Sequence, residues 1–161
     1  MRLGRRALLG GTFALGCTGA RAATLGDDGL YHEPWFVESF LDLPDDLATA
    51  KTAGQRLVVA WELRGCPFCR RMHEEVLAKP EVVAFLQPRF AFVQLDLIGA
   101  REVTWLDGSK SSEKALAARL DVRGTPTFQV FDTEGRERDR LQGFVPPEPF
   151  LAFFRRVVPG T

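Results

Sequence analysis

A run of five apolar residues, Leu57–Trp61, is followed after four further positions by the motif Cys66-Pro67-Phe68-Cys69. An apolar run of this length predicts a central strand that is buried on both faces. From Cys66 to about Ala78, apolar residues recur at helical spacing, which predicts a helix that begins at the first cysteine. A second strand-like run, Phe90–Asp96, completes a β-α-β unit, whose strands we expect to be parallel with a right-handed crossover.

The rest of the chain predicts one α/β domain around this unit. Its 161 residues, 45% of them hydrophobic and 26% charged, suffice for a single packed core and are not typical of a disordered chain. Three cysteines are too few for a disulfide-rich scaffold. We therefore expect β-α-β then β-β-α around a mixed central sheet, after an N-terminal helical segment. The further elements expected are one or two helices within 34–55, a hairpin or turn near 103–108, a helix from Ser111 or Ser112 to Leu120, strands at Thr127–Phe131 and Arg136–Phe144, and a helix from Pro147 to Val158.

Residues 1–22 predict a secretory signal peptide. A basic start with three arginines precedes an apolar stretch, and Ala20-Arg21-Ala22 fits a cleavage site before Ala23. The apolar stretch is far shorter than the roughly 20 residues of a membrane span. The alternative, an amphipathic first helix of the domain, lacks a polar face. The organisation expected is a signal peptide at 1–22, a flexible leader rich in Gly and Asp at 23–33, and a folded domain at 34–161.

Two details of this segment bear on the export route. The pair Arg5-Arg6 resembles a twin-arginine signal, which directs export after folding, whereas an ordinary secretory signal is the alternative. Cys17 loosely resembles the lipid-carrying cysteine of a lipoprotein, whereas the alternative is a small apolar residue that is removed with the signal. We expect a periplasmic protein of a bacterium, with a lipid anchor at Cys17 as the minor alternative.

The charge balance argues against nucleic-acid binding. The chain has 21 basic and 21 acidic residues, and a nucleic-acid-binding domain would show a basic excess. Four of the basic residues and none of the acidic ones lie within 1–22, so the remainder carries a net charge of −4. Only two cysteines remain in that part, and both belong to one motif.

The spacing of these two cysteines predicts thiol–disulfide chemistry. Cys66 falls at the N-terminus of a helix, where unpaired N–H groups and the helix dipole stabilise an attacking thiolate. Pro67 occupies a position where its missing N–H costs nothing. Cys69, one turn further, is placed to resolve a mixed disulfide with Cys66. The alternatives are a structural disulfide, whose small loop would stabilise little, and a zinc site, which lacks two further ligands.

A second motif, Gly124-Thr125-Pro126-Thr127, directly precedes an apolar strand. A proline at this position is a candidate for a cis peptide bond, with a trans bond as the alternative. Together with the Cys motif, the order of elements from Leu57 to Val158 resembles the thioredoxin superfamily. The segments Trp35-Phe36, Ser39–Leu43, Gly65–Cys69, Met72-His73, Val93–Asp96 and Thr125–Phe128 are similar to SoxW-type periplasmic thioredoxins of bacterial sulfur-oxidation systems.

This resemblance implies how the site would work. Pro126 would be cis and lie beside the cysteines with Thr125, and substrate peptides would pair with the backbone before the proline. Pro67 and Phe68 would belong to the same substrate-binding surface, and a Cys66–Cys69 disulfide would form in the oxidised state. The partners expected are periplasmic proteins with disulfides, with a membrane thiol-transporting reductase as electron donor. We expect no cofactor and no metal, and a monomer.

One departure from the superfamily concerns the proton of Cys69. Thioredoxins commonly carry a buried acid six residues before the first cysteine, which accepts this proton, but Ala60 occupies that position here. Glu62 lies on the same strand face and is our candidate acceptor; the alternatives are water in that role, or a solvated glutamate near a loop. His73, one helical turn after Cys69, is expected at the surface or half-buried, with a minor tuning role as the alternative.

The function predicted is that of an exported thiol–disulfide oxidoreductase that reduces partner disulfides in a sulfur-oxidation or related thiol pathway. One rival is a DsbA-like oxidant; such proteins carry a large helical insertion, whereas 97–123 has room for one helix and a turn. The other rival is a redox-inert module that binds peptides through the proline loop.

Overall fold

The computed structural model describes residues 23–158, and its centre is a four-stranded mixed sheet. Strand β3 (Arg56–Glu62) pairs in parallel with β4 (Phe90–Asp96) on one side. On its other side it pairs antiparallel with β7 (Thr127–Phe131), and β8 (Glu137–Gln142) forms the edge next to β7. The α/β fold with a mixed central sheet is therefore confirmed.

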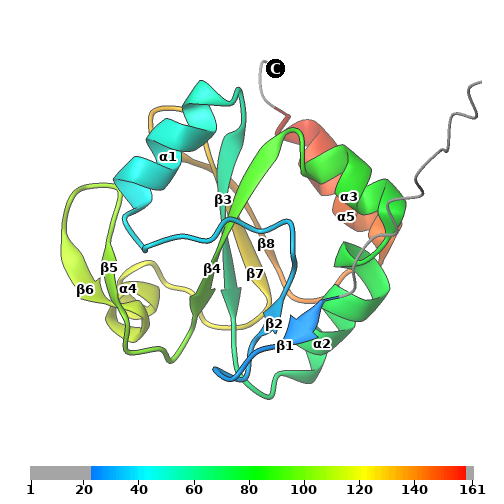
Figure 1. Ribbon diagram of the computed structural model, residues 1–161, viewed down its shortest axis with the longest axis horizontal. Coiled ribbons are helices and arrows are strands. Elements are labelled where there is room, and N and C mark those ends of the chain that lie inside the picture. The colour runs from blue at the N-terminus through cyan, green and yellow to red at the C-terminus, as the bar shows by residue number, and fades with distance from the viewer. Residues whose placement is uncertain (1–22, 159–161) are drawn as a thin grey trace, which may run out of the picture.

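Helices cover both faces of this sheet (Figure 1). One face carries α2 (Pro67–Met72), a π-helical turn η1 (His73–Leu77), α3 (Pro80–Leu86) and α5 (Pro147–Arg156). The other face carries α1 (Leu43–Thr52), α4 (Glu113–Arg119) and the hairpin of β5 (Glu102–Thr104) and β6 (Lys110–Ser112).

The alternation of side chains along β3 explains why its sequence is apolar throughout. Val58 and Ala60 belong to the core beneath α2, α3 and α5, whereas Val59 and Trp61 belong to the core beneath α1 and α4. Each residue of the strand after Arg56 is buried. As the last residue of the strand, Glu62 points to the same face as Ala60 and therefore toward α2.

The helix after the first cysteine differs from the expected single helix at 66–78. Its α-helical part ends at Met72, and a π turn follows, in which the N–H of Ala78 donates to the carbonyl of His73 at 3.0 Å. Such turns insert one extra residue into a helix and are frequent at functional sites.

The N-terminal part of the described chain contains one helix and one short hairpin. One helix, α1, forms within 34–55; Asp42 caps it, and Gly54, with a φ of 69°, follows its end. The segment expected to be a flexible leader contains a hairpin of β1 (Thr24–Leu25) and β2 (Tyr31–His32). Asp28 stabilises its turn, because its carboxylate accepts hydrogen bonds from the backbone of Leu30 and from His32.

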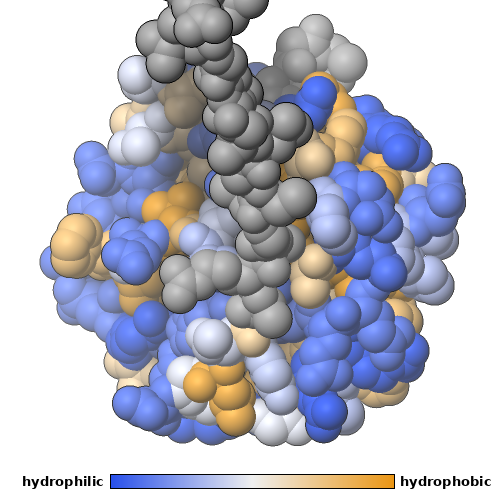
Figure 2. Space-filling model, turned by 45° about the vertical axis from the view of Figure 1, so that its right-hand side comes forward, coloured by the Kyte–Doolittle hydropathy of each residue, from blue (hydrophilic) through white to orange (hydrophobic). Residues whose placement is uncertain are grey.

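No helix within residues 23–158 is long and apolar enough to cross a membrane. Figure 2 shows a face that is mainly hydrophilic, with apolar residues in small separate patches. The predicted signal peptide and Cys17 lie outside the described residues.

Candidate active site

The two cysteines lie at the start of α2, where the chain leaves the carboxyl end of β3. Gly65, with a φ of 71°, makes the turn into the helix, and Cys66 is the N-cap residue. The backbone N–H of Cys69 donates to Cys66 Sγ at 3.1 Å, as the predicted thiolate position at a helix N-terminus requires. Pro67 occupies the first turn, where no hydrogen bond is lost.

The two thiols differ in access. Cys66 is partly exposed, whereas Cys69 is buried with 2% of its surface accessible. Phe68 between them is 53% exposed and offers an apolar contact beside the reactive sulfur. Cys66 and Cys69 are not joined by a disulfide in this structure, and the Cys66–Cys69 disulfide stays a prediction for the oxidised form.

The loop before β7 lies against Cys66. The peptide bond between Thr125 and Pro126 is cis. The hydroxyl of Thr125 donates to Cys66 Sγ at 3.3 Å, and the carbonyl of Thr125 lies 3.8 Å from the same sulfur. The structure thus brings together Cys66 and the loop 59 residues away, as the sequence predicts.

The second thiol is held in its protonated form. Burial raises the pKa of Cys69, and its contact with Cys66 and the negative charge of Glu62 raise it further. The hydroxyl of Thr125 and the backbone of Leu63 oppose this shift only in part. Because the thiolate is the nucleophile in disulfide exchange, Cys69 needs a proton acceptor when it attacks.

Glu62 is buried and not solvated, and it forms a cluster with two other ionisable side chains, His73 and Glu33. Glu62 Oε1 lies 2.7 Å from His73 Nε2, and Glu33 Oε1 lies 2.9 Å from His73 Nδ1. The expected surface or half-buried place for His73 is wrong, since its side chain is fully buried. His73 follows Cys69 by four residues on the inner side of the helix, and the two carboxylates satisfy both ring nitrogens.

This cluster holds His73 as a cation. Burial alone would lower the pKa of His73, but the hydrogen bonds and negative charges of Glu33 and Glu62 outweigh it and raise the pKa to about 9. The ring also stacks on Tyr31, with the two ring centroids 5.6 Å apart. The imidazolium therefore balances one of two buried carboxylates.

The sequence analysis did not identify Glu33, and it assigned His73 at most a minor tuning role. Glu33 directly precedes Pro34-Trp35-Phe36, and an acid beside such an apolar group is a signal that it could be buried. Its partner, however, is 40 residues away in the sequence, so no local pattern joins the two.

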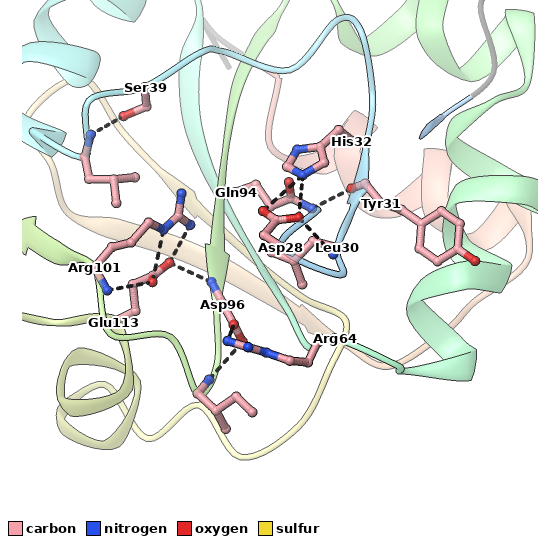
Figure 3. Close-up of polar contacts among 12 residues, drawn as sticks. Asp28, Leu30, Tyr31, His32, Ser39, Arg64, Gln94, Asp96, Arg101 and Glu113 are labelled. Atoms are coloured by element: carbon pink, nitrogen blue, oxygen red, sulfur yellow. Dashed lines mark hydrogen bonds and ion pairs between the residues drawn. The ribbon is translucent and has the colours of Figure 1, made fainter. Parts of the chain in front are cut away.

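The surroundings of Cys66 include a further ion pair on the β3–α2 loop. Arg64 Nη2 donates to Asp96 Oδ2 at 2.7 Å, which ties this loop to the end of β4 (Figure 3). This ion pair anchors the loop that precedes Cys66 to the end of β4.

Comparison with known proteins identifies the class of protein. The family model of thioredoxin-like domains matches residues 43–157, so the chain belongs to the thioredoxin-like domain family. It is 34% identical over 127 residues to the thiol:disulfide interchange protein DsbD 2 of Pseudomonas aeruginosa, covering 77% of this chain. The chain spans 20% of the length of that relative and 15% of DsbD from Pectobacterium atrosepticum.

Solved structures agree with this family. A thioredoxin from Thermus thermophilus matches with a TM-score of 0.58 and 30% identity, over 72% of this chain and 83% of that one. The C-terminal domain of DsbD from Neisseria meningitidis in its oxidised form matches with a TM-score of 0.54 over 71% of this chain and 91% of that one. At 23% identity, the latter match supports the fold alone.

The site has the groups that thiol–disulfide exchange requires. It combines a partly exposed nucleophile at a helix N-terminus, a buried second thiol one turn away and a peptide backbone beside the first sulfur. These groups can attack a disulfide, hold a mixed disulfide and resolve it.

Proposed function

We propose that the protein is exported to a bacterial periplasm, where it reduces disulfides of partner proteins through Cys66 and Cys69. The observation that carries this proposal is the contact of Cys66 Sγ with Thr125, which sets the nucleophile beside a backbone segment that can pair with a substrate peptide. The homology to thiol:disulfide interchange proteins supports the same chemistry.

The reaction proceeds in two exchanges. The Cys66 thiolate attacks one sulfur of the substrate disulfide, the substrate S–S bond breaks, and one substrate sulfur leaves as a thiolate. Cys69 then loses its proton and attacks Cys66 Sγ, so that the Cys66–Cys69 disulfide forms and the second substrate thiolate leaves. Two electrons have passed to the substrate, and an external dithiol must return them.

Glu62 is our candidate for the acceptor of the Cys69 proton. Its charge acts on Cys69, and its Oε2 is buried without a hydrogen-bond partner among the described residues. A carboxylate oxygen in this state can take a proton without first losing another contact.

The physiological setting belongs to the proposal as well. The similarity to SoxW-type thioredoxins favours a sulfur-oxidation or related thiol pathway, with a membrane thiol-transporting reductase as donor and the protein acting as a monomer. An oxidant of DsbA-like direction uses the same pair of thiols and differs in reduction potential.

The test is reduction of insulin disulfides with dithiothreitol as the electron source. Cys66→Ser should lower the rate to that without protein, because no nucleophile remains. Cys69→Ser should also lose turnover, and when the reduced variant is mixed with insulin without dithiothreitol it should trap insulin as a covalent mixed disulfide on Cys66. Full activity of Cys66→Ser would contradict the catalytic role of Cys66. A wild type no faster than dithiothreitol alone would support a redox-inert binding module.

A further inference from the structure

Glu33, His73 and Glu62 join three elements behind the cysteines. Glu33 follows β2, His73 begins the π turn after α2, and Glu62 ends β3. Their side chains are 0%, 0% and 1% exposed, and both ring nitrogens of His73 are hydrogen-bonded. Buried charges cost several kcal/mol when they lose a partner, so these three groups depend on one another.

Each of the two carboxylates has one oxygen that accepts no hydrogen bond from the described residues. Glu62 Oε2 and Glu33 Oε2 are buried without hydrogen-bond partners within residues 23–158. The first belongs to the residue whose charge acts on Cys69. The cluster thus has a proton-accepting atom at each end, with the imidazole between them.

The Glu33 end of the cluster meets a surface hollow of about 510 Å³. Figure 3 shows that three polar side chains of its walls have partners. Arg101 pairs with Glu113, His32 with Asp28, and Gln94 donates to the carbonyl of Tyr31. Glu33 is thus the member of the cluster that lies beside this hollow, although its carboxylate is itself buried.

We propose that Glu33 is a positioning residue that acts through His73 to keep Glu62 able to accept the proton of Cys69. This inference rests on the proposed function. With both carboxylates ionised and His73 protonated, the cluster carries one negative charge and becomes neutral when Glu62 takes the proton. Without the charge of Glu33, the same step would create a net positive charge in the core, which burial disfavours.

The other titratable groups around the cluster do not replace Glu33. Tyr31 stacks on the His73 ring, and Cys66 and Cys69 lie beyond Glu62. Within the described chain, His73 is the only cationic side chain bonded to either carboxylate. The loss of the Glu33 charge is therefore uncompensated.

The experiment separates the two exchanges with the reduced protein and 5,5′-dithiobis(2-nitrobenzoate). Attack of Cys66 breaks the reagent's S–S bond and releases one coloured thiolate. Attack of Cys69 on the mixed disulfide then releases the second, so that the reagent gains two electrons and the cysteine pair loses two. The first phase reports the proposed function and the second phase reports the inference.

Glu33→Gln should slow the second phase about tenfold at pH 6, because Glu62 becomes a weaker proton acceptor, and leave the first phase unchanged. His73 should titrate at a lower pH in this variant, by NMR of its ring. Once His73 of the variant is neutral, its cluster regains one negative charge, so the two rates should converge between the pH at which the variant's His73 titrates and about pH 9, where the wild-type His73 titrates. Above that pH they should separate again, because the wild-type cluster then gains a second negative charge.

Glu38→Gln is the matched control, since it makes the same change on an exposed residue of the same segment. It should leave both phases unchanged. A second phase of wild-type rate in Glu33→Gln at pH 6, or one slowed equally at every pH, would overturn the inference. Absence of the first phase in the wild type would instead overturn the proposed function.

The wild type provides a test that does not depend on the folding of a variant. Its second phase should accelerate across the pH range in which NMR shows His73 losing its proton, because the cluster then gains a negative charge. A second phase without a break in that range would also overturn the inference.

Discussion

At the scale of single residues, the proton of Cys69 connects the site to the buried charges behind it. Alanine occupies position 60, where thioredoxins commonly carry a buried acidic residue. Glu62 places a carboxylate two residues later on the same face of the strand. That carboxylate is held by His73, which Glu33 holds in turn. A single buried acid is replaced by three mutually dependent groups.

The cluster predicts a dependence of stability on pH. Because the pKa of His73 in the folded chain is about 9, above its ordinary 6.5, its contribution is complete below pH 6.5 and is lost as the pH rises toward 9. We expect the free energy of unfolding in urea to fall by about 2 kcal/mol from pH 6 to pH 8.5.

The control for this prediction is His32→Gln. His32 is the other histidine and pairs with Asp28 on the surface, so that its loss should leave the pH profile intact. A free energy of unfolding that stays constant from pH 6 to pH 8.5 would contradict a cationic His73.

Local spacing made part of the site predictable. Cys66, Cys69, Thr125 and Pro126 belong to two short motifs, and each motif has a recognisable place before or after a strand. The contact of Glu33 with His73 depends on how the β1–β2 hairpin packs against α2, and this packing follows from the whole fold. Sequence alone could therefore name Glu62 but not its partners.

At the scale of elements, α5 closes the core over the sheet through its aromatic residues. Phe154 packs against Phe90, Phe150 and Phe153, with ring centroids 4.9–5.1 Å apart, and it is fully buried. The α2 face of the sheet thus depends on a helix from the end of the chain.

Phe154→Ala should lower the free energy of unfolding by about 3–5 kcal/mol, because it leaves a cavity among these rings. Urea unfolding at pH 6 measures this loss. The matched change, Phe40→Ala, removes a fully exposed ring and should change stability by less than about 0.5 kcal/mol. Similar losses in the two variants would contradict the packing of α5.

The predictable elements are those whose pattern is local and periodic. The apolar runs of β3, β4 and β7 and the aromatic stripe of α5 are visible in the sequence. The π turn is not visible in the sequence, because it adds one residue within an ordinary helical pattern. The β1–β2 hairpin is not visible either, because it depends on the hydrogen bond that the Asp28 side chain accepts within the turn. Both of these elements border the His73 cluster.

At the scale of the whole molecule, the segments before and after the predicted cleavage site carry net charges of opposite sign. The four arginines within 1–22 account for its neutrality, and the part from Ala23 onward carries a net charge of −4. In the chain as a whole, the redox pair and the cluster lie in that acidic part.

Export predicts a mature chain that begins at Ala23. Mass spectrometry of protein recovered from a bacterial periplasm should show the loss of residues 1–22. A chain that keeps these residues would contradict export by signal cleavage, and a lipid-modified chain that begins at Cys17 would support the lipoprotein alternative.

The direction of electron flow is the central claim, and the reduction potential of the Cys66–Cys69 pair tests it most directly. The protein is equilibrated with glutathione redox buffers, and the dithiol and disulfide forms are separated after thiol alkylation. A reductant should show a potential near that of thioredoxin, about −270 mV. A value near about −120 mV, typical of DsbA, would contradict the reductant role.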